Sequence, residues 1–224
     1  RQLVDNETLA VIGEMSAAVA HGIRNPLAAI RSSAELIQGG DLPQAHDAAA
    51  DIVAQSDRLE AWVRELLAYT RPLDGVVAPV PLQPLVARCL DEFRREMERR
   101  NIHSHTALAA GLPAVRGDAL LLGQVLSSLL SNAIEALDRE GQITVRGDWV
   151  RGQKEVTLSV QDSGPGMTGA QLKRAGKPFH TTKARGLGVG LALARRVIER
   201  FGGRLEIDSG PGRGTTVRLH MPAA

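Results

Sequence analysis

Apolar residues recur at alternating intervals of three and four along the first part of the chain. The repeating positions are Leu9, Ile12, Val19, Ile23, Ile30 and Ile37, with Ser16, Pro26 and Ser33 as interruptions. This spacing marks the a and d positions of a heptad repeat and predicts one long helix over about residues 2–38. The Gly39–Pro43 segment supplies a helix stop and a turn. A second seam begins at Ile52 and predicts a helix that ends before Arg71, because the residue before a proline resists the helical conformation.

These two helices form a hairpin that is only two helices thick, so one hairpin cannot bury its own apolar seam. The simplest partner is a second copy, which gives a four-helix bundle in a homodimer. The composition then changes abruptly, because residues 73–84 contain Pro79, Pro81 and Pro84 and predict a linker. We therefore expect a helical domain over residues 1–72 and a second domain over residues 85–224.

The second domain mixes helical and strand periodicities. Helical patterns cover about residues 85–100, 118–137 and a stretch ending near Phe201, and strand patterns cover about residues 102–107, 142–150, 155–162, 204–209 and 215–221. Asp118 is the expected N-cap of the second of these helices. Helices beside a mixed sheet predict an α/β sandwich. The expected fold class is thus two-domain, an all-α antiparallel hairpin followed by an α/β sandwich.

Composition narrows the classes of function. Aromatic residues make up only 3% of the chain and the net charge is +2, so we expect no nucleic-acid partner. The sequence has no apolar run of the roughly 18 residues that a membrane span needs, and we expect no direct membrane contact from this segment. Cys89 is the one cysteine, which is typical of a reducing, cytoplasmic compartment.

His21 falls at heptad position f when Leu9 is position a, so its ring is expected on the solvent-facing side of the helix. Asn25 lies one turn later on the same face. Pro26 cannot donate a backbone hydrogen bond to the Gly22 carbonyl and predicts a kink directly after the histidine. An exposed helical histidine most often has no special role, but a glycine and a proline inside a regular heptad are costly and indicate function.

This segment resembles the H-box of two-component sensor histidine kinases. The matching residues are His21, Arg24, Asn25, Pro26 and Leu27. The resemblance implies that His21 is phosphorylated and that Asn25 assists phosphotransfer and dephosphorylation. Gly22 departs from the pattern, because the family usually carries Glu or Asp there as a base for the imidazole. Neutral imidazole is itself a nucleophile at about pH 7, so we predict a slow kinase in which Gly22→Glu speeds autophosphorylation.

Three further motifs lie in the second domain. Asn132 sits on a predicted helix, and a buried amide needs partners such as a metal ion with phosphate oxygens. Asp162 ends a strand and is followed by Gly164 and Gly166; the carboxylate can accept from the amino group of adenine, and the glycines let the backbone approach a flat base. The run Gly186–Gly190 opens a helix, whose free N–H groups and dipole favour an anion. Each motif alone also fits a core helix, a turn or a solvated loop.

In this order and spacing, the motifs resemble the ATP-binding domain of the GHKL superfamily, in its histidine-kinase branch. The resemblance implies that Asp162 recognises adenine, that Gly164 and Gly166 line the base pocket, and that Asn132 coordinates magnesium. It also implies a phosphate-binding turn at Gly186, Gly188 and Gly190. The implied lid over the phosphates includes Thr181, Thr182 and Lys183. Two departures are Ser128, where the family often has a further Asn, and His180, where the lid motif usually has Phe.

The predicted function is an ATP- and Mg²⁺-dependent protein histidine kinase of a two-component system. It would phosphorylate His21 and pass the group to an aspartate on the receiver domain of a response regulator. We expect a cytoplasmic location, either free or as the cytoplasmic part of a membrane-anchored sensor. One alternative is a GHKL ATPase, which would carry Glu four residues before Asn132, where this chain has Ser128. The other is a nucleotide-binding pseudokinase or dimeric scaffold, which would leave His21 unmodified.

Overall fold

The structure of the 224-residue chain is a computed structural model. It describes all residues except 1, 40–41, 71, 138, 150–153 and 179–187, and for residues 2–19, 21 and 42 it describes the helical backbone alone. The chain divides into two compact units, residues 1–71 with 179–189 and residues 72–178 with 190–224.

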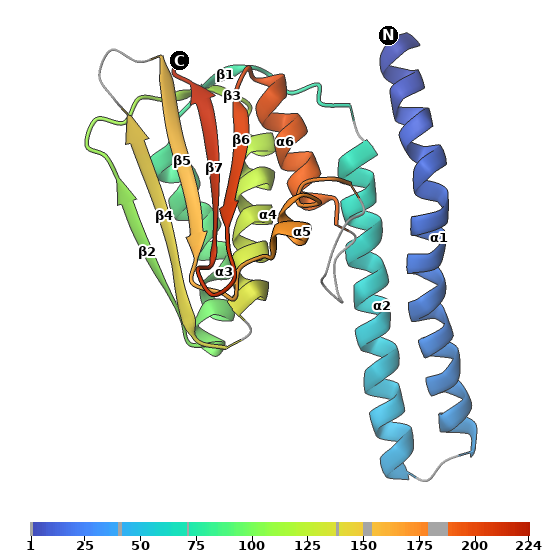
Figure 1. The fold of residues 1–224 in the computed structure, drawn as a ribbon. Coiled ribbons are helices and arrows are strands. Elements are labelled where there is room, and N and C mark those ends of the chain that lie inside the picture. The colour runs from blue at the N-terminus through green and yellow to red at the C-terminus, as the bar shows by residue number, and fades with distance from the viewer. Residues whose placement is uncertain (1, 40–41, 71, 138, 150–153, 179–187) are drawn as a thin grey trace. The chain divides into compact units, whose positions relative to one another are not determined.

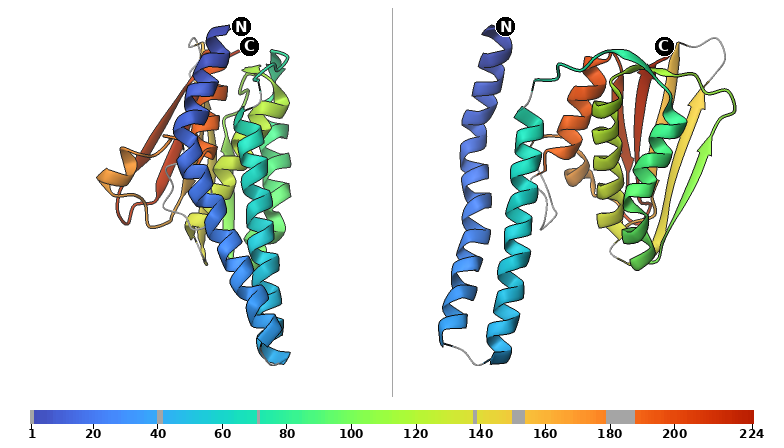
Figure 2. Two further views of the ribbon diagram at one scale, coloured as in Figure 1. Left: turned by 90° about the vertical axis from the view of Figure 1, so that its right-hand side faces the viewer. Right: turned by 180° about the vertical axis from the view of Figure 1, so that it is seen from behind.

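Two long helices form the first unit. Helix α1 covers Gln2–Gly39 and helix α2 covers Leu42–Thr70, and they run antiparallel and side by side (Figures 1 and 2). Pro26 lies inside α1 and is buried. Trp62 and Tyr69 of α2 are buried as well. The predicted helical hairpin is confirmed.

One hairpin leaves part of its apolar surface uncovered. Among the hairpin side chains that the structure describes, the exposed large apolar ones are Leu27, Leu36, Ile37, Val53, Val63 and Leu67. Ile37 belongs to the predicted heptad seam, yet it is 39% exposed, and Val63 of α2 is 50% exposed. Val53, Val63 and Leu67 fall within one sector of α2, because their spacing keeps them on one side of a helix with 3.6 residues per turn. This sector has the character of an interface that a single hairpin does not fill.

A five-stranded sheet forms the framework of the second unit, in the order β2-β4-β5-β7-β6. The strands are β2 Ile102–Leu108, β4 Gly141–Trp149, β5 Glu155–Asp162, β6 Arg204–Ser209 and β7 Thr215–Pro222. β2 pairs parallel with β4, and the other pairings of this sheet are antiparallel. The helices α3 Leu82–Arg99, α4 Ala119–Leu137 and α6 Gly190–Arg200 lie on one face of the sheet (Figures 1 and 2). The predicted α/β sandwich is confirmed.

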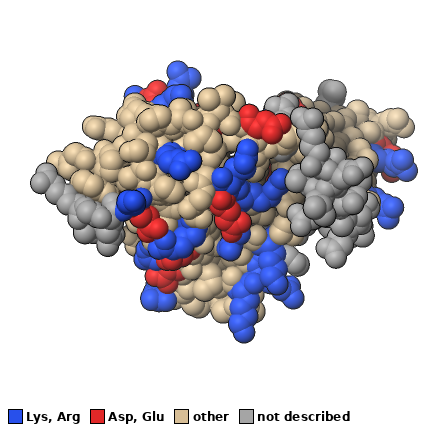
Figure 3. Space-filling model, turned by 90° about the horizontal axis from the view of Figure 1, so that it is seen from above, with Lys and Arg blue, Asp and Glu red and all other residues tan. Residues whose placement is uncertain are grey.

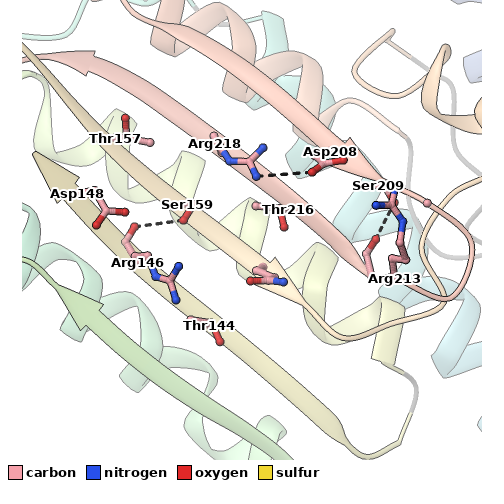
Figure 4. Close-up of a pocket in the computed structure, with 13 residues that line it drawn as sticks. Thr144, Arg146, Asp148, Thr157, Ser159, Asp208, Ser209, Arg213, Thr216 and Arg218 are labelled. Atoms are coloured by element: carbon pink, nitrogen blue, oxygen red, sulfur yellow. Dashed lines mark hydrogen bonds and ion pairs between the residues drawn. The ribbon is translucent and has the colours of Figure 1, made fainter.

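Strand β5 shows how the sequence produces two unlike faces. Val156, Leu158 and Val160 are 0%, 2% and 4% exposed and lie on the buried face. Thr157 and Ser159 alternate with them and lie on the opposite, open face (Figure 4). This period of two is the pattern that predicted the strand.

Helix α4 is the central core helix of this unit. Leu126, Leu130 and Ile134 are each at most 1% exposed. Among the helices that the structure describes, α4 alone is long and apolar enough to cross a membrane by composition. Its contacts with α3, α6, β4 and β5 account for that apolar character, because core helices need it as well.

The predicted N-cap of α4 is confirmed. The Asp118 Oδ1 atom accepts hydrogen bonds from the backbone N–H groups of Leu120 at 2.8 Å and Leu121 at 3.0 Å. The other carboxylate oxygen accepts from Val76 N–H at 3.0 Å. Asp118 thus satisfies the helix start and also ties down the chain that follows the first unit.

Three short elements were not predicted. Strand β1, Ala78–Val80, pairs antiparallel with strand β3, Val115–Gly117. Strand β1 lies within residues 73–84, which we predicted to be a linker, and α3 also begins in this segment. Val80 and Val115 are both buried, which gives this small pair its anchor. Helix α5, Gly169–Leu172, starts with a capping box between Thr168 and Gln171. Elements of three or four residues are too short to show a periodic pattern.

Candidate nucleotide and phosphoacceptor sites

The H-box lies in the middle part of α1. His21 is part of this helix, and its side chain lies outside the described residues. Asn25, one turn later, is exposed. Pro26 follows and is buried, so the Asn25 side chain lies on the exposed side of the helix and the Pro26 ring lies on the buried side. Since proline cannot donate to the Gly22 carbonyl, the helix lacks one backbone hydrogen bond at this point.

The second unit positions Asp162 at the end of β5. The side chain is only 6% exposed. Its Oδ1 atom accepts hydrogen bonds from the backbone N–H of Gly164 at 2.9 Å and of Thr215 at 3.2 Å. Two backbone donors fix the carboxylate in one orientation and compensate its burial. The group is thus preorganised to accept a hydrogen bond from a ligand.

The glycines after Asp162 are required by close backbone contacts. Gly166 has a φ of 69°, and a Cβ atom there would lie 2.0 Å from the Gly210 carbonyl oxygen. At Gly164, a Cβ atom would lie 2.9 Å from Asp162 Oδ1 and 3.1 Å from the Ala136 carbonyl oxygen of α4. Side chains at these positions would displace the loop from both of its supports.

The turn between β6 and β7 supports this loop, and we did not predict that role. Met167 N–H donates to Ser209 Oγ at 2.9 Å, and Ser209 Oγ donates to the Gly214 carbonyl at 2.9 Å. A Cβ atom at Gly214 would lie 2.0 Å from the Asp162 carbonyl oxygen. The available signal was the number of glycines in the GPGRG sequence, since a hairpin turn alone does not need three.

Helix α4 brings the other motifs together. A Cβ atom at Gly190, the first residue of α6, would lie 2.5 Å from Ser128 Oγ and 3.8 Å from Asn132 Nδ2. One turn after Asn132, Ala136 contacts Gly164 through its carbonyl group. Successive turns of α4 therefore contact the start of α6 and the loop after β5. Asn132 lies between these two contacts, as a shared site requires.

The remaining predicted residues belong to the lid and the glycine-rich turn. Gly188 has a φ of 77°, a left-handed conformation that favours glycine. Thr181, Thr182, Lys183 and Gly186 lie outside the described residues. Their assignment to a lid and a phosphate-binding turn stays a prediction.

A pocket of about 400 Å³ lies on the open face of the sheet (Figure 4). Its lining includes Arg146, Ser159, Asp208 and Arg218, and Arg218 pairs with Asp208 at 3.6 Å. Its lining contains none of the described residues that we predicted to bind the nucleotide. On the surface drawn in Figure 3, basic side chains are interspersed with acidic ones.

Two protein-family models match the chain. The His Kinase A (phospho-acceptor) domain matches residues 11–75, and the histidine kinase-, DNA gyrase B-, and HSP90-like ATPase matches residues 117–224. The chain belongs to the histidine kinase family. The first match contains His21 and the second contains Asp162 and Asn132, so the chain carries the two-domain core of a sensor histidine kinase.

Relatives support the same assignment over nearly the whole chain. Sensor histidine kinase ZraS of Escherichia coli (strain K12) is 34% identical over 232 residues, which cover 99% of this chain and 49% of ZraS. Sporulation kinase E of Bacillus subtilis (strain 168) is 31% identical over 224 residues, which cover 99% of this chain and 30% of that protein. The chain spans about half or less of the length of these curated relatives.

Solved structures agree in fold. Histidine kinase ThkA, crystallised in complex with response regulator protein TrrA, matches with a TM-score of 0.83 and 27% identity, covering 98% of this chain and 64% of that one. The catalytic domain of ThkA alone, in a nucleotide-free form, matches with a TM-score of 0.61 and 27% identity over 66% of this chain and 96% of that one.

Proposed function

We propose that this chain is an ATP-dependent protein histidine kinase that phosphorylates its own His21. The observation that carries the proposal is the combination of an H-box on α1 with a buried Asp162, held by two backbone N–H groups and followed by glycines that have no room for a Cβ atom. The first supplies a nucleophile and the second supplies a place for adenine.

In the proposed reaction, a ring nitrogen of His21 attacks the γ-phosphorus of ATP. A nitrogen–phosphorus bond forms, the bond between that phosphorus and the β,γ-bridging oxygen breaks, and ADP leaves. The proton of the ring passes to water, because Gly22 provides no carboxylate. The nitrogen–phosphorus bond then breaks as the phosphoryl group moves to a carboxylate oxygen of an aspartate on a receiver domain, and the ring takes a proton back from water, which restores the neutral imidazole. Positioning supplies most of the catalysis in such transfers.

Asn132 fits the role of a magnesium ligand. Its carboxamide oxygen is a hard donor of the type that Mg²⁺ prefers, and it lies on α4 beside the start of α6. Within the described part of the chain, His, Cys, Asp and Glu side chains form no metal-binding group of three or more. Magnesium is therefore expected to rely on phosphate oxygens and water for its other ligands, and when bound it neutralises phosphate charge.

The partners belong to the same proposal. The exposed sector of α2 fits a second hairpin, so we infer a homodimer with a four-helix bundle. The complex of ThkA with a response regulator supports a receiver domain as the acceptor of the phosphoryl group. A cytoplasmic location is consistent with the single cysteine.

A labelling experiment separates this proposal from its alternatives. Purified chain is incubated with Mg²⁺ and γ-labelled ATP, beside His21→Gln and the control His46→Gln, which changes an exposed histidine of α2. If the chain is a histidine kinase, the parent chain and the control should carry acid-labile, alkali-stable label, and His21→Gln should carry none. Free phosphate without labelled protein would indicate an ATPase, and neither product would indicate a scaffold.

A further inference from the structure

Gly22, the residue directly after His21, is in contact with an aromatic ring of α2. A Cβ atom built on Gly22 would lie 2.4 Å from Trp62 Cζ3 and 2.9 Å from Trp62 Cη2. These distances are far below van der Waals contact, so any side chain at position 22 would overlap the indole. Gly22 lies within a regular helix and has no left-handed φ, so its backbone conformation does not require glycine. The space that Trp62 takes is what requires it.

Trp62 is itself held in place. Trp62 is only 8% exposed. The guanidinium group of Arg58 lies over its ring, 5.5 Å from the ring centroid. This geometry is that of a cation–π contact. A ring that is buried and stacked in this way cannot swing aside without losing both contacts.

The contact coincides with a weak point of α1. Pro26 removes the hydrogen bond to the Gly22 carbonyl, and glycine is itself the most flexible residue in a helix interior. The turn that carries His21 therefore has little rigidity of its own. Packing of Trp62 against Gly22 supplies the tertiary support that this turn lacks.

We propose that Trp62 is a positioning residue for the phosphoacceptor. It fixes the turn that carries His21 by packing on Gly22, and it fills the space that a side chain at position 22 would need. This inference rests on the proposed function. It also reverses the prediction made from the sequence, because Gly22→Glu should now slow phosphorylation unless Trp62 is shortened at the same time.

The packing can be measured without any kinase activity. The chain contains two tryptophans, so Trp149→Phe leaves Trp62 as the one indole fluorophore. In that background, Gly22→Ala and Gly22→Glu should each shift the Trp62 emission to longer wavelength and increase quenching by acrylamide. Ala54→Glu, at an exposed position of α2, should change neither quantity.

The positioning role is tested by the rate of His21 labelling. Trp62→Ala and Gly22→Glu should each lower kcat about tenfold, because small displacements of a nucleophile cost at least that much, while the KM for ATP stays unchanged. The kcat of Trp62→Phe should lie between the values of Trp62→Ala and the parent chain. This variant tests the same prediction if Trp62→Ala does not fold. The double variant Gly22→Glu/Trp62→Ala should label faster than either single variant.

The pH dependence distinguishes restored chemistry from restored packing. A carboxylate beside the imidazole favours the protonated ring, so the double variant should reach half of its maximal rate at a higher pH than Trp62→Ala does. The inference would be overturned if the effects of the two substitutions on kcat were additive. It would also be overturned if Gly22→Glu alone labelled faster than the parent chain and left the Trp62 emission unchanged. Parent chain without label on His21 would instead contradict the proposed function.

Discussion

The proposed nucleotide site depends on a single buried carboxylate, Asp162. One of its oxygens is held by two backbone N–H groups, so the side chain cannot turn freely to suit different ligands. These two N–H groups belong to Gly164 and Thr215, which are distant from each other in the sequence. The side chain therefore links the loop after β5 to the start of β7, and in the proposed function it also accepts a hydrogen bond from adenine.

Replacing this carboxylate should weaken ATP binding without unfolding the domain. Asp162→Asn keeps an oxygen for the backbone donors but replaces a charged acceptor, and we expect affinity to fall by about 10- to 100-fold, the value of one charge-assisted hydrogen bond. Calorimetric titration with a non-hydrolysable ATP analogue measures it. Asp208→Asn, an exposed carboxylate on the open face of the sheet, is the matched control. Equal affinities for the parent chain and Asp162→Asn would contradict this role.

At the scale of elements, the contact between α4 and α6 decides whether the motifs can act together. Gly190→Ala should lower both thermal stability and ATP affinity, because the new methyl group would lie 2.5 Å from Ser128 Oγ. Ser128→Ala removes the obstructing atom, so the double variant should regain most of both losses. Thermal unfolding and nucleotide titration of the four proteins measure this coupling. Losses that simply add would show that the two residues do not share this contact.

A charged cluster lies on the three neighbouring strands β5, β7 and β6, and its contribution to stability depends on pH. Hydrogen bonding from Arg204 lowers the pKa of Glu155 and of Glu206 below their usual values, and His220 lies between the two carboxylates, 3.1 Å from Glu155 Oε1 and 3.3 Å from Glu206 Oε2. A lowered pKa in the folded state stabilises the domain above the ordinary carboxyl pKa of about 4.3, and this stabilisation is lost as the pH falls below it.

Arg204→Ala should therefore lower the Tm more at pH 7 than at about pH 3, where part of this charge-dependent stabilisation has been lost. Gln124→Ala, an exposed and uncharged position of α4, should differ from the parent chain by the same amount at both pH values. A pH-independent deficit in Arg204→Ala would show that the cluster contributes packing rather than charge.

Elements with a strong period were predictable from the sequence, and short or tertiary features were not. The alternation at Val156, Leu158 and Val160 predicted β5, and Asp118 predicted the start of α4. Strand β1 has three residues and no period, so its segment was predicted to be a linker. The hydrogen bond from Met167 N–H to Ser209 Oγ and the packing of Trp62 on Gly22 depend on contacts between residues about 40 or more positions apart, which no local pattern reveals.

For the whole molecule, the exposed sector of α2 is the basis of the proposed homodimer. Val63→Glu and Leu67→Glu place a charge in this sector and should convert the dimer to a monomer, because a buried unpaired charge is very unfavourable. Sedimentation or light scattering measures the mass. Val76→Glu, at an exposed apolar position outside the hairpin, should remain dimeric. A parent chain that is monomeric at micromolar concentration would contradict the four-helix bundle.

The most direct test of the account follows ATP occupancy and His21 phosphorylation in one titration. If ATP bound at the proposed site beside Asp162 supplies the phosphoryl group, the initial rate of labelling and the bound fraction should rise with the same midpoint, since KM equals Kd when the chemical step is slow. Asp162→Asn should shift both midpoints by the same factor, and His21→Gln should abolish labelling while it leaves binding unchanged. Saturation of the chain with ATP while His21 stays unmodified would contradict the proposed kinase reaction.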